Sequence, residues 1–252
     1  MAFRFDAGSF SSVPLPLASR QRAVLALLVA CGAGAVLPAT ARSSPPARRA
    51  VLGRSVDGRP IVAVEVGDPA SPRALVVGCI HGNECAGVPI AERLEALSPP
   101  RGVDLWIVPD LNPDGNARGT RGNAHGVDLN RNFPWHWRPL SGSCDSGPRP
   151  LSEPESRIAH RLILRLRPRI SIWFHQHLDL VDESGGNPSV ERSFARLTGL
   201  PLRRLARYPG SVASWENAAL PGTTAFVVEL PPGSLSAAAA DRFSRAVLEV
   251  AR

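Results

Sequence analysis

Residues 74–97 read ALVVGCIHGNECAGVPIAERLEAL and divide into an apolar run, a polar turn and a helical segment. Residues 74–80 are almost continuously apolar, which is typical of a strand covered on both faces. Residues 86–97 repeat apolar side chains at the spacing of an amphipathic helix. A strand that leads through a tight turn into a helix is the repeating unit of α/β proteins, so this stretch decides the fold class.

The same alternation continues along the chain. Apolar runs predict further strands at residues 60–66, 103–108, 170–174 and 223–230, and helical spacing predicts helices at residues 152–167 and 236–252. We therefore expect an α/β fold with a mixed, largely parallel sheet and helices on both faces. Residues 109–150 are rich in Gly, Asn, Asp and Pro without periodicity, and a loop of that length in a compact domain is usually functional.

The N-terminal segment has the features of an export signal. Arg20 and Arg22 precede an apolar run at residues 23–36, and Ala-Thr-Ala at residues 39–41 offers a cleavage site with small side chains. The apolar run is too short to remain in a bilayer as a spanning helix. We therefore expect this segment to be removed on export.

The chain of 252 residues is long enough for one large domain. We predict a signal peptide at residues 1–41, a flexible leader at residues 42–50 and a folded domain at residues 51–252. This division predicts a secreted or cell-envelope protein that acts as a monomer. An alternative is a lipid anchor, because the LVAC sequence that ends at Cys31 is similar to a lipoprotein cleavage box, and only then would the protein be held at a membrane.

All 29 basic residues are Arg, and the formal net charge is +7. The Arg residues are scattered among Pro, Leu and Ala and do not form a stripe interleaved with aromatic residues. This distribution argues against a nucleic-acid partner. A basic surface that faces an anionic cell wall fits the same charge.

Three cysteines remain beyond the predicted signal peptide: Cys79, Cys85 and Cys144. In an oxidising compartment one pair can form a disulfide and the third is left over. A bridge from Cys144 to either of the others would pin its Gly- and Ser-rich loop beside the polar turn. The sequence leaves the pairing open.

The polar turn carries two candidate metal ligands, His81 and Glu84. Zn²⁺ takes imidazole nitrogen and carboxylate oxygen in a tetrahedral shell, so this pair can form part of a zinc site. His175 and His177 follow the strand predicted at residues 170–174, and either can supply a third ligand because residues two apart on an extended segment point to the same face. A His-Glu-His set with one open position is the arrangement of a catalytic zinc site.

Other residues offer the groups that such a site needs. Glu229, near the end of the strand predicted at residues 223–230, is costly to bury unless it is used or paired, and it can serve as general base and acid. Arg121 can stabilise a developing oxyanion. Arg131 and the amide of Asn130 can hold a substrate carboxylate through parallel hydrogen bonds. The alternative for this loop is an Arg-rich solvated surface.

These residues, in this order, resemble the zinc carboxypeptidase family. The matching set is His81, Glu84, Arg121, Asn130, Arg131, His175 and Glu229. The sequences HGNE at residues 81–84 and GVDLNRNFP at residues 126–134 are similar in particular to the bacterial murein peptide amidases, which release diaminopimelate from γ-D-glutamyl stem peptides. The resemblance implies the zinc carboxypeptidase fold.

The resemblance also implies a function. It implies a metallopeptidase or amidase that cleaves a peptide or γ-D-glutamyl amide bond next to a free carboxylate. One zinc ion would be bound by His81, Glu84 and His175, with Glu229 as general base and acid, Arg121 on the oxyanion, and Asn130, Arg131 and Tyr208 on the substrate. Tyr208 is the only Tyr of the chain, and its spacing to Trp215 differs from that in digestive carboxypeptidases.

Two other interpretations remain. The same motifs resemble N-acyl amino acid deacylases of the succinylglutamate desuccinylase and aspartoacylase kind, but the export signal and the Asn-Phe-Pro sequence at residues 132–134 argue against them. The second is a non-catalytic protein that binds the cell wall on the same scaffold. It is disfavoured because every catalytic position of the motif set is filled.

Overall fold

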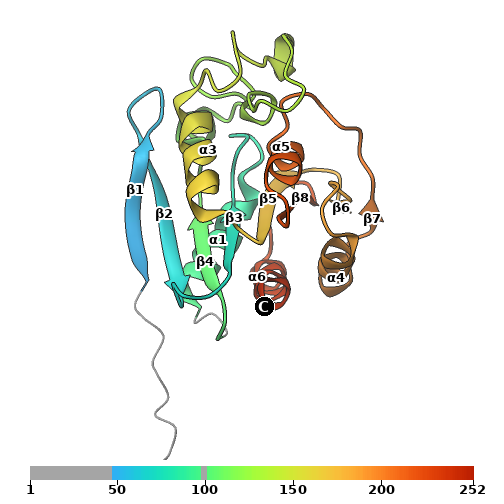
Figure 1. Cartoon of the computed structure of the whole chain (residues 1–252). Helices are drawn as coiled ribbons and strands as arrows, with labels where there is room; N and C mark the ends of the chain where they lie inside the picture. The colour runs from blue at the N-terminus through green and yellow to red at the C-terminus, as the bar shows by residue number, and fades with distance from the viewer. Residues whose placement is uncertain (1–46, 98–100) are drawn as a thin grey trace, which may run out of the picture. The chain divides into compact units, whose positions relative to one another are not determined.

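A mixed sheet forms the centre of the protein in the computed structural model, which describes residues 47–97 and 101–252 (Figure 1). Its strands are β1 (Arg48–Arg54), β2 (Pro60–Gly67), β3 (Arg73–Val77), β4 (Asp104–Val108), β5 (Ile170–Gln176), β6 (Leu180–Asp182), β7 (Leu202–Arg203) and β8 (Thr224–Leu230). They follow the order β1-β2-β4-β3-β5-β8-β6-β7. The central strands β4, β3, β5 and β8 are parallel, whereas β1–β2, β2–β4 and β6–β8 are antiparallel pairs.

Helices cover both faces of this sheet. They are α1 (Val88–Ala96), α2 (Pro113–Arg118), α3 (Pro154–Leu166), α4 (Pro188–Thr198), α5 (Val212–Ala219) and α6 (Ala237–Ala251). Helices α1, α4 and α6 pack on one face, and α3 and α5 pack on the other, which is turned toward the viewer in Figure 1. The predicted α/β fold, with a mixed sheet between helical layers, is confirmed.

The side-chain alternation of β3 shows how the two cores arise. Ala74 and Val76 face the cluster of α1, α4 and α6, whereas Leu75 and Val77 face the cluster of α3 and α5. Both sets are nearly inaccessible to solvent. A strand buried on both faces must be apolar at every position, which explains the unbroken run in the sequence.

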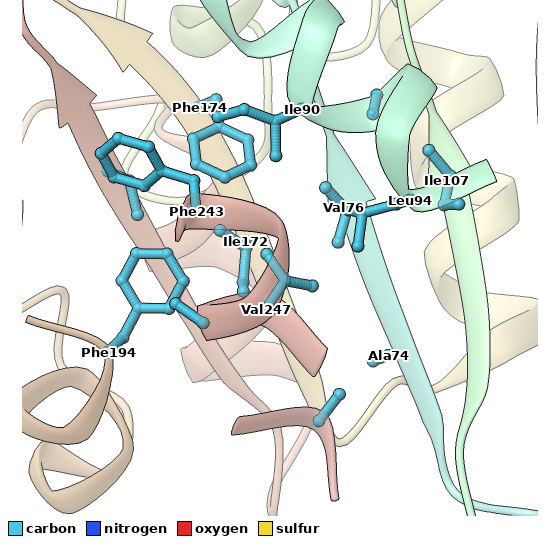
Figure 2. Packing of buried hydrophobic residues seen from close by; sticks show 14 of the residues in the cluster. Ala74, Val76, Ile90, Leu94, Ile107, Ile172, Phe174, Phe194, Phe243 and Val247 are labelled. Carbon is cyan, nitrogen blue, oxygen red and sulfur yellow. The ribbon is translucent and has the colours of Figure 1, made fainter. Parts of the chain in front are cut away.

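Aromatic side chains fill the first of these cores. Figure 2 shows Phe174, Phe194 and Phe243 grouped with Ile172 and Val247. The rings of Phe174 and Phe243 meet edge to face, with centroids 6.3 Å apart. This packing fixes α6 against β5, the strand that ends at the candidate site.

Some predicted boundaries change. Strand β1 begins at Arg48, inside the leader predicted at residues 42–50, because Arg48 pairs with Glu65 of β2 and donates hydrogen bonds to its carboxylate. The short strands β6 and β7 and the helices α2, α4 and α5 were not predicted. Most of these segments are too short to show a period, but α4 is amphipathic over 11 residues and the prediction missed it. The predicted signal peptide and Cys31 lie outside the described residues. Within the described ranges, no helix has the length and apolar character needed to cross a membrane.

The disulfide joins Cys79 to Cys85, whose Cα atoms are 4.7 Å apart. It spans the polar turn between β3 and α1. Cys144 is unpaired among the described residues, so the alternative bridge that would pin its loop is not formed. The disulfide therefore stabilises the turn that carries His81 and Glu84.

A buried carboxyl lies between α5 and the sheet. Glu216 is fully buried, and it accepts hydrogen bonds from Ser171 Oγ (2.6 Å) and Trp173 Nε1 (2.7 Å). Burial raises the pKa of Glu216 to about 7, and these two hydrogen bonds do not offset it. The folded state therefore retains a proton that the unfolded chain releases near the ordinary glutamate pKa of 4.5.

This proton makes stability depend on pH. The contribution of Glu216 is complete below about pH 4.5 and is lost as the pH rises toward about 7, because the unfolded state binds fewer protons there. We expect Glu216→Gln to weaken the fall in unfolding free energy between pH 5 and pH 7.5 by about 1–3 kcal/mol. Urea unfolding of both proteins at pH 5 and pH 7.5 measures this difference in unfolding free energy. Glu92→Gln, at an exposed position of α1, is the control and should leave the slope unchanged.

Candidate metal centre

The candidate site lies at the carboxyl ends of the parallel strands. His81 and Glu84 follow β3 in the turn that leads to α1, and His175 lies near the end of β5. Glu229 lies near the end of β8 and is the register partner of His175. Because β3, β5 and β8 are neighbours, side chains from three distant parts of the sequence meet at one edge.

The turn after β3 can adopt its path only because residue 82 is a glycine. A Cβ atom at Gly82 would collide with the backbone of Gly115 and Asn116 in α2. Helix α2 is held there by Asn112, whose side-chain nitrogen donates to the carbonyl of Ile80 (3.1 Å) and whose side-chain oxygen accepts from Gly115 N (3.0 Å). The loop after β4 thus presses directly against the turn that carries the two candidate ligands.

Three ligand atoms converge in this site. His81 Nδ1 lies 2.9 Å from Glu84 Oε2, and His175 Nδ1 lies 3.1 Å from each of these two atoms. His81 and His175 are almost completely buried, and Glu84 is 9% exposed. His177 is exposed and does not join the three, although it lines the same pocket. The structure thus groups the three residues that the family resemblance implies as ligands.

This arrangement fits a zinc ion. Three atoms that all carry lone pairs repel one another at about 3 Å unless a proton or a cation lies between them. Two imidazoles and one carboxylate are a donor set that Zn²⁺ prefers, and ligands about 2.0–2.2 Å from a tetrahedral ion lie only slightly farther apart than these atoms do. His81, Glu84 and His175 would therefore hold the ion and leave one position open.

Asp128 orients the first of these ligands, and the sequence did not assign it this role. Its Oδ1 accepts hydrogen bonds from His81 Nε2 (2.8 Å) and from Asn130 N (2.9 Å), and the residue is completely buried. A carboxylate on the far nitrogen of a ligating imidazole fixes the tautomer, so that Nδ1 of His81 offers its lone pair to the metal. In the sequence, Asp128 is visible only as part of the loop motif at residues 126–134.

The charges of this cluster shift the pKa values of Asp128, Glu84 and His175 in the directions that metal binding needs. Burial opposes protonation of His81, but Asp128 and Glu84 outweigh it and raise the pKa of His81, so a metal ion would displace a proton from this imidazole. Burial opposes ionisation of Asp128, but His81 and Arg121 outweigh it and hold the pKa of Asp128 below its usual range. Burial likewise opposes ionisation of Glu84, but its contacts with His175 and His81 lower the pKa of Glu84 far below its usual range. Burial and the neighbouring His81 lower the pKa of His175. Glu84 is therefore a carboxylate and His175 a neutral imidazole at neutral pH.

Arg121 lies in the same cluster. Its Nη1 donates to Glu84 Oε1 (2.6 Å) and its Nε donates to Asp128 Oδ2 (2.9 Å). The guanidinium is 27% exposed and lines the pocket. It therefore lies close enough to the candidate metal ligands to place positive charge at the reaction centre.

Glu229 faces the pocket beside His175. Its Oε2 is buried and has no hydrogen-bond partner among residues 47–97 and 101–252. A buried carboxylate oxygen without a partner is costly, and such atoms are usually satisfied by water, ligand or a proton. This oxygen is therefore available for a water molecule or a substrate group.

Arg131 is a buried guanidinium on the same pocket wall. It is 7% exposed, forms no salt bridge within the described part of the chain, and its Nε has no hydrogen-bond partner there. Its Nη1 donates to the carbonyl of Asn130 (2.8 Å), and the ring of Tyr208 lies 4.5 Å from its Cζ atom. A buried cation without an anionic partner is suited to receive an anionic ligand.

Asn130 and Tyr208 are placed around this guanidinium. The side-chain oxygen of Asn130 accepts from Val212 N (3.0 Å), and its amide nitrogen lies 3.5 Å from His175 Nε2 with a second N–H group left to donate. Tyr208 is half exposed, and the loop after it is fixed because Gly210 packs on the carbonyl of Arg131, where any Cβ would collide. The structure thus brings all residues of the predicted site into one pocket of about 300 Å³.

A parallel-centred α/β sheet with a His-Glu-His cluster and a free carboxylate at its carboxyl edge defines a zinc-dependent hydrolase. Comparisons with known proteins agree. The zinc carboxypeptidase family profile matches residues 100–181. Murein peptide amidase A of Escherichia coli strain K12 is 30% identical over 195 residues, which make up 71% of this chain and 80% of that protein. The Vibrio campbellii protein of the same name is 30% identical over 215 residues, covering 78% and 85%.

Solved structures give the same result. The crystal structure of the murein-tripeptide amidase from Escherichia coli O157 matches with a TM-score of 0.67 at 29% identity, over 84% of this chain and 94% of that one. Carboxypeptidase A from Helicoverpa armigera, at 18% identity, shares the fold with a TM-score of 0.68 over 81% and 67% of the two chains. The chain belongs to the zinc carboxypeptidase family, and it is a zinc enzyme of the hydrolase class.

The choice between the two histidines of β5 can be tested by metal content. We expect His175→Ala to lose zinc, because one of the three converging ligand atoms is removed. His177→Ala is the matched control and should keep one zinc per chain. Metal analysis of the dialysed proteins measures both. Retention of zinc by His175→Ala together with its loss from His177→Ala would contradict this ligand set.

Asp128→Asn tests the orienting carboxylate. The amide keeps the size of the side chain but removes the charge that faces His81, so we expect zinc affinity to fall about 10- to 100-fold without loss of the fold. Competition with a chromophoric chelator measures the affinity. Asp57→Asn is the control. It changes a partly exposed carboxylate that pairs with Arg118 and contacts none of the metal ligands, so this variant should bind zinc as the wild type does.

Proposed function

We propose that the protein hydrolyses a peptide or γ-D-glutamyl amide bond next to a free carboxylate, in stem peptides of peptidoglycan. The observation that carries this proposal is the pocket that combines the metal ligands with two groups that have no hydrogen-bond partner among the described residues, Oε2 of Glu229 and Nε of Arg131. The relatives named murein peptide amidase A support the substrate class. The family membership and complete site argue against a non-catalytic wall-binding protein.

In this proposal Glu229 handles the protons. Zinc, when bound by His81, Glu84 and His175, polarises a water molecule and lowers its pKa toward neutrality. The free oxygen of Glu229 takes a proton from the attacking water and returns it to the leaving amine. Its register position opposite His175 and its place in the pocket lining support this role.

Three other side chains bind and orient the substrate. Arg131 and the amide nitrogen of Asn130 hold the free carboxylate, and the ring of Tyr208 covers the guanidinium. Arg121 donates to the oxyanion that develops at the scissile carbonyl. Its present contacts with Glu84 and Asp128 keep the guanidinium at the edge of the metal cluster.

The proposal extends to the place of action. A secreted or cell-envelope monomer, with residues 1–41 as the signal peptide, would meet peptidoglycan outside the cytoplasm. The predicted export signal and the basic composition support this location. A lipid anchor on Cys31 is the alternative, and mass spectrometry of the mature N-terminus would distinguish the two.

The proton-transfer role is tested by Glu229→Gln. The amide cannot accept the proton of the attacking water, so we expect kcat to fall at least about 100- to 10,000-fold while zinc content stays at one per chain. Rates are measured on a γ-D-glutamyl-diaminopimelate tripeptide. Glu92→Gln should have wild-type activity. Full activity of the zinc-loaded Glu229→Gln variant would show that another group serves as the base.

The substrate class is tested with the wild-type protein. We expect cleavage of the stem tripeptide, no comparable hydrolysis of N-succinylglutamate, and loss of activity on treatment with a metal chelator. Mass spectrometry of the products identifies the bond that is cut. Faster hydrolysis of N-succinylglutamate would favour a deacylase, and binding of the stem peptide without turnover would contradict a catalytic function.

A further inference from the structure

The pocket contains a third guanidinium, that of Arg207, which the motif set does not include. Arg207 lies in the segment between β7 and α5, is 27% exposed and lines the same pocket as Glu229 and Arg131. The proposed reaction uses Arg131 for one substrate carboxylate and Arg121 for the oxyanion. Arg207 has no function in those steps.

A buried carboxylate holds this guanidinium in place. Asp182, at the end of β6, accepts from Arg207 Nη1 with Oδ1 (3.2 Å) and Oδ2 (2.9 Å). It also accepts from Leu205 N (2.8 Å) and Ser184 Oγ (2.7 Å), and it is 4% exposed. Its lone pairs are thus fully used, so Asp182 positions Arg207 and has no capacity left to bind a cationic ligand.

Arg207 itself keeps hydrogen-bonding capacity. Its Nη1 also donates to the carbonyl of Leu205 (3.3 Å), and its Nη2 donates to the carbonyl of Glu183. A guanidinium has five N–H groups, and these contacts, with Asp182, do not engage Nε in the part of the chain that the structure describes. The group is therefore held rigidly at the pocket wall with a donor left for a ligand.

The pocket that Arg207 lines also suits a side chain with an aliphatic stem. Its lining includes the small or apolar residues Ala206, Ala213, Leu178 and Val227 together with Ser184 and Ser214. Methylene groups can pack on such a lining, while a carboxylate at their end would meet the guanidinium.

We propose that Arg207, positioned by Asp182, selects substrates in which the amino acid released by cleavage carries a carboxylate at the end of its side chain. This inference rests on the proposed function and names the group that distinguishes its substrates. One carboxylate of that amino acid binds Arg131 and the other binds Arg207. Diaminopimelate has both carboxylates, and lysine is the same molecule without the second one.

The test compares two stem tripeptides that differ only in diaminopimelate or lysine at the third position. We expect the wild type to favour the diaminopimelate peptide in kcat/KM by about 10- to 100-fold, the contribution of a hydrogen-bonded charged group. Arg207→Ala should lose this preference, because its kcat/KM should fall for the diaminopimelate peptide and stay unchanged for the lysine peptide. Arg204→Ala removes a neighbouring exposed guanidinium that does not line the pocket, and it should keep the preference.

The ratio of the two rates within one preparation does not depend on how much enzyme is folded. If Arg207→Ala does not fold, Arg207→Gln, which can still donate to Asp182, should show the same loss of preference. A wild type that cleaves both peptides equally would overturn the role of Arg207 and leave the proposed function intact. So would an Arg207 variant that keeps the preference, or one that slows equally on both peptides. A wild type that cleaves neither peptide would overturn both proposals.

Discussion

His81, Glu84 and His175 bring three lone-pair atoms within 3.1 Å of one another, and these buried atoms repel one another unless a proton or a cation lies between them. The surrounding structure keeps the three atoms together. The Cys79–Cys85 disulfide spans the turn that carries two of them, and the register of β3, β5 and β8 supplies the third. Asp128 adds a buried negative charge on the far side of His81.

The charged side chains around this centre are of two kinds, those that are paired with each other and those that are not. Arg121 and Asp128 neutralise each other next to the metal ligands, so the cluster is stable within the protein itself. Arg131 and Glu229 lack such partners among the described residues, and burying them has a cost that the fold alone does not offset. The proposed function assigns substrate and water binding to groups of the second kind, because a ligand can supply the hydrogen bonds that they lack within the described residues.

The fold was largely predictable because its central strands are buried on both faces. Residues 74–77 and 224–230 are apolar almost throughout, and such runs leave few alternatives. The edges were harder to predict. Strand β1 contains Arg48 and Arg49, whose charges are tolerated because the strand lies at the edge of the sheet and pairs with Glu65 and Glu95 of neighbouring elements. The two-residue strand β7 is too short to show a period, whereas helix α4 has an amphipathic pattern that the prediction missed.

By itself, the sequence determined the α/β class and the residue types of the site, since His81, His175 and Glu229 lie at or near the ends of apolar runs and Glu84 follows His81 in the same polar turn. Only the tertiary structure decided which groups meet. The imidazoles of His81 and His175 are 94 residues apart in the chain, Asp128 reaches His81 across 47 residues, and Arg207 reaches Asp182 across 25. Such contacts depend on strand register and loop packing, which no local pattern encodes. That is why Asp128 and Arg207 emerged from the structure and not from the sequence.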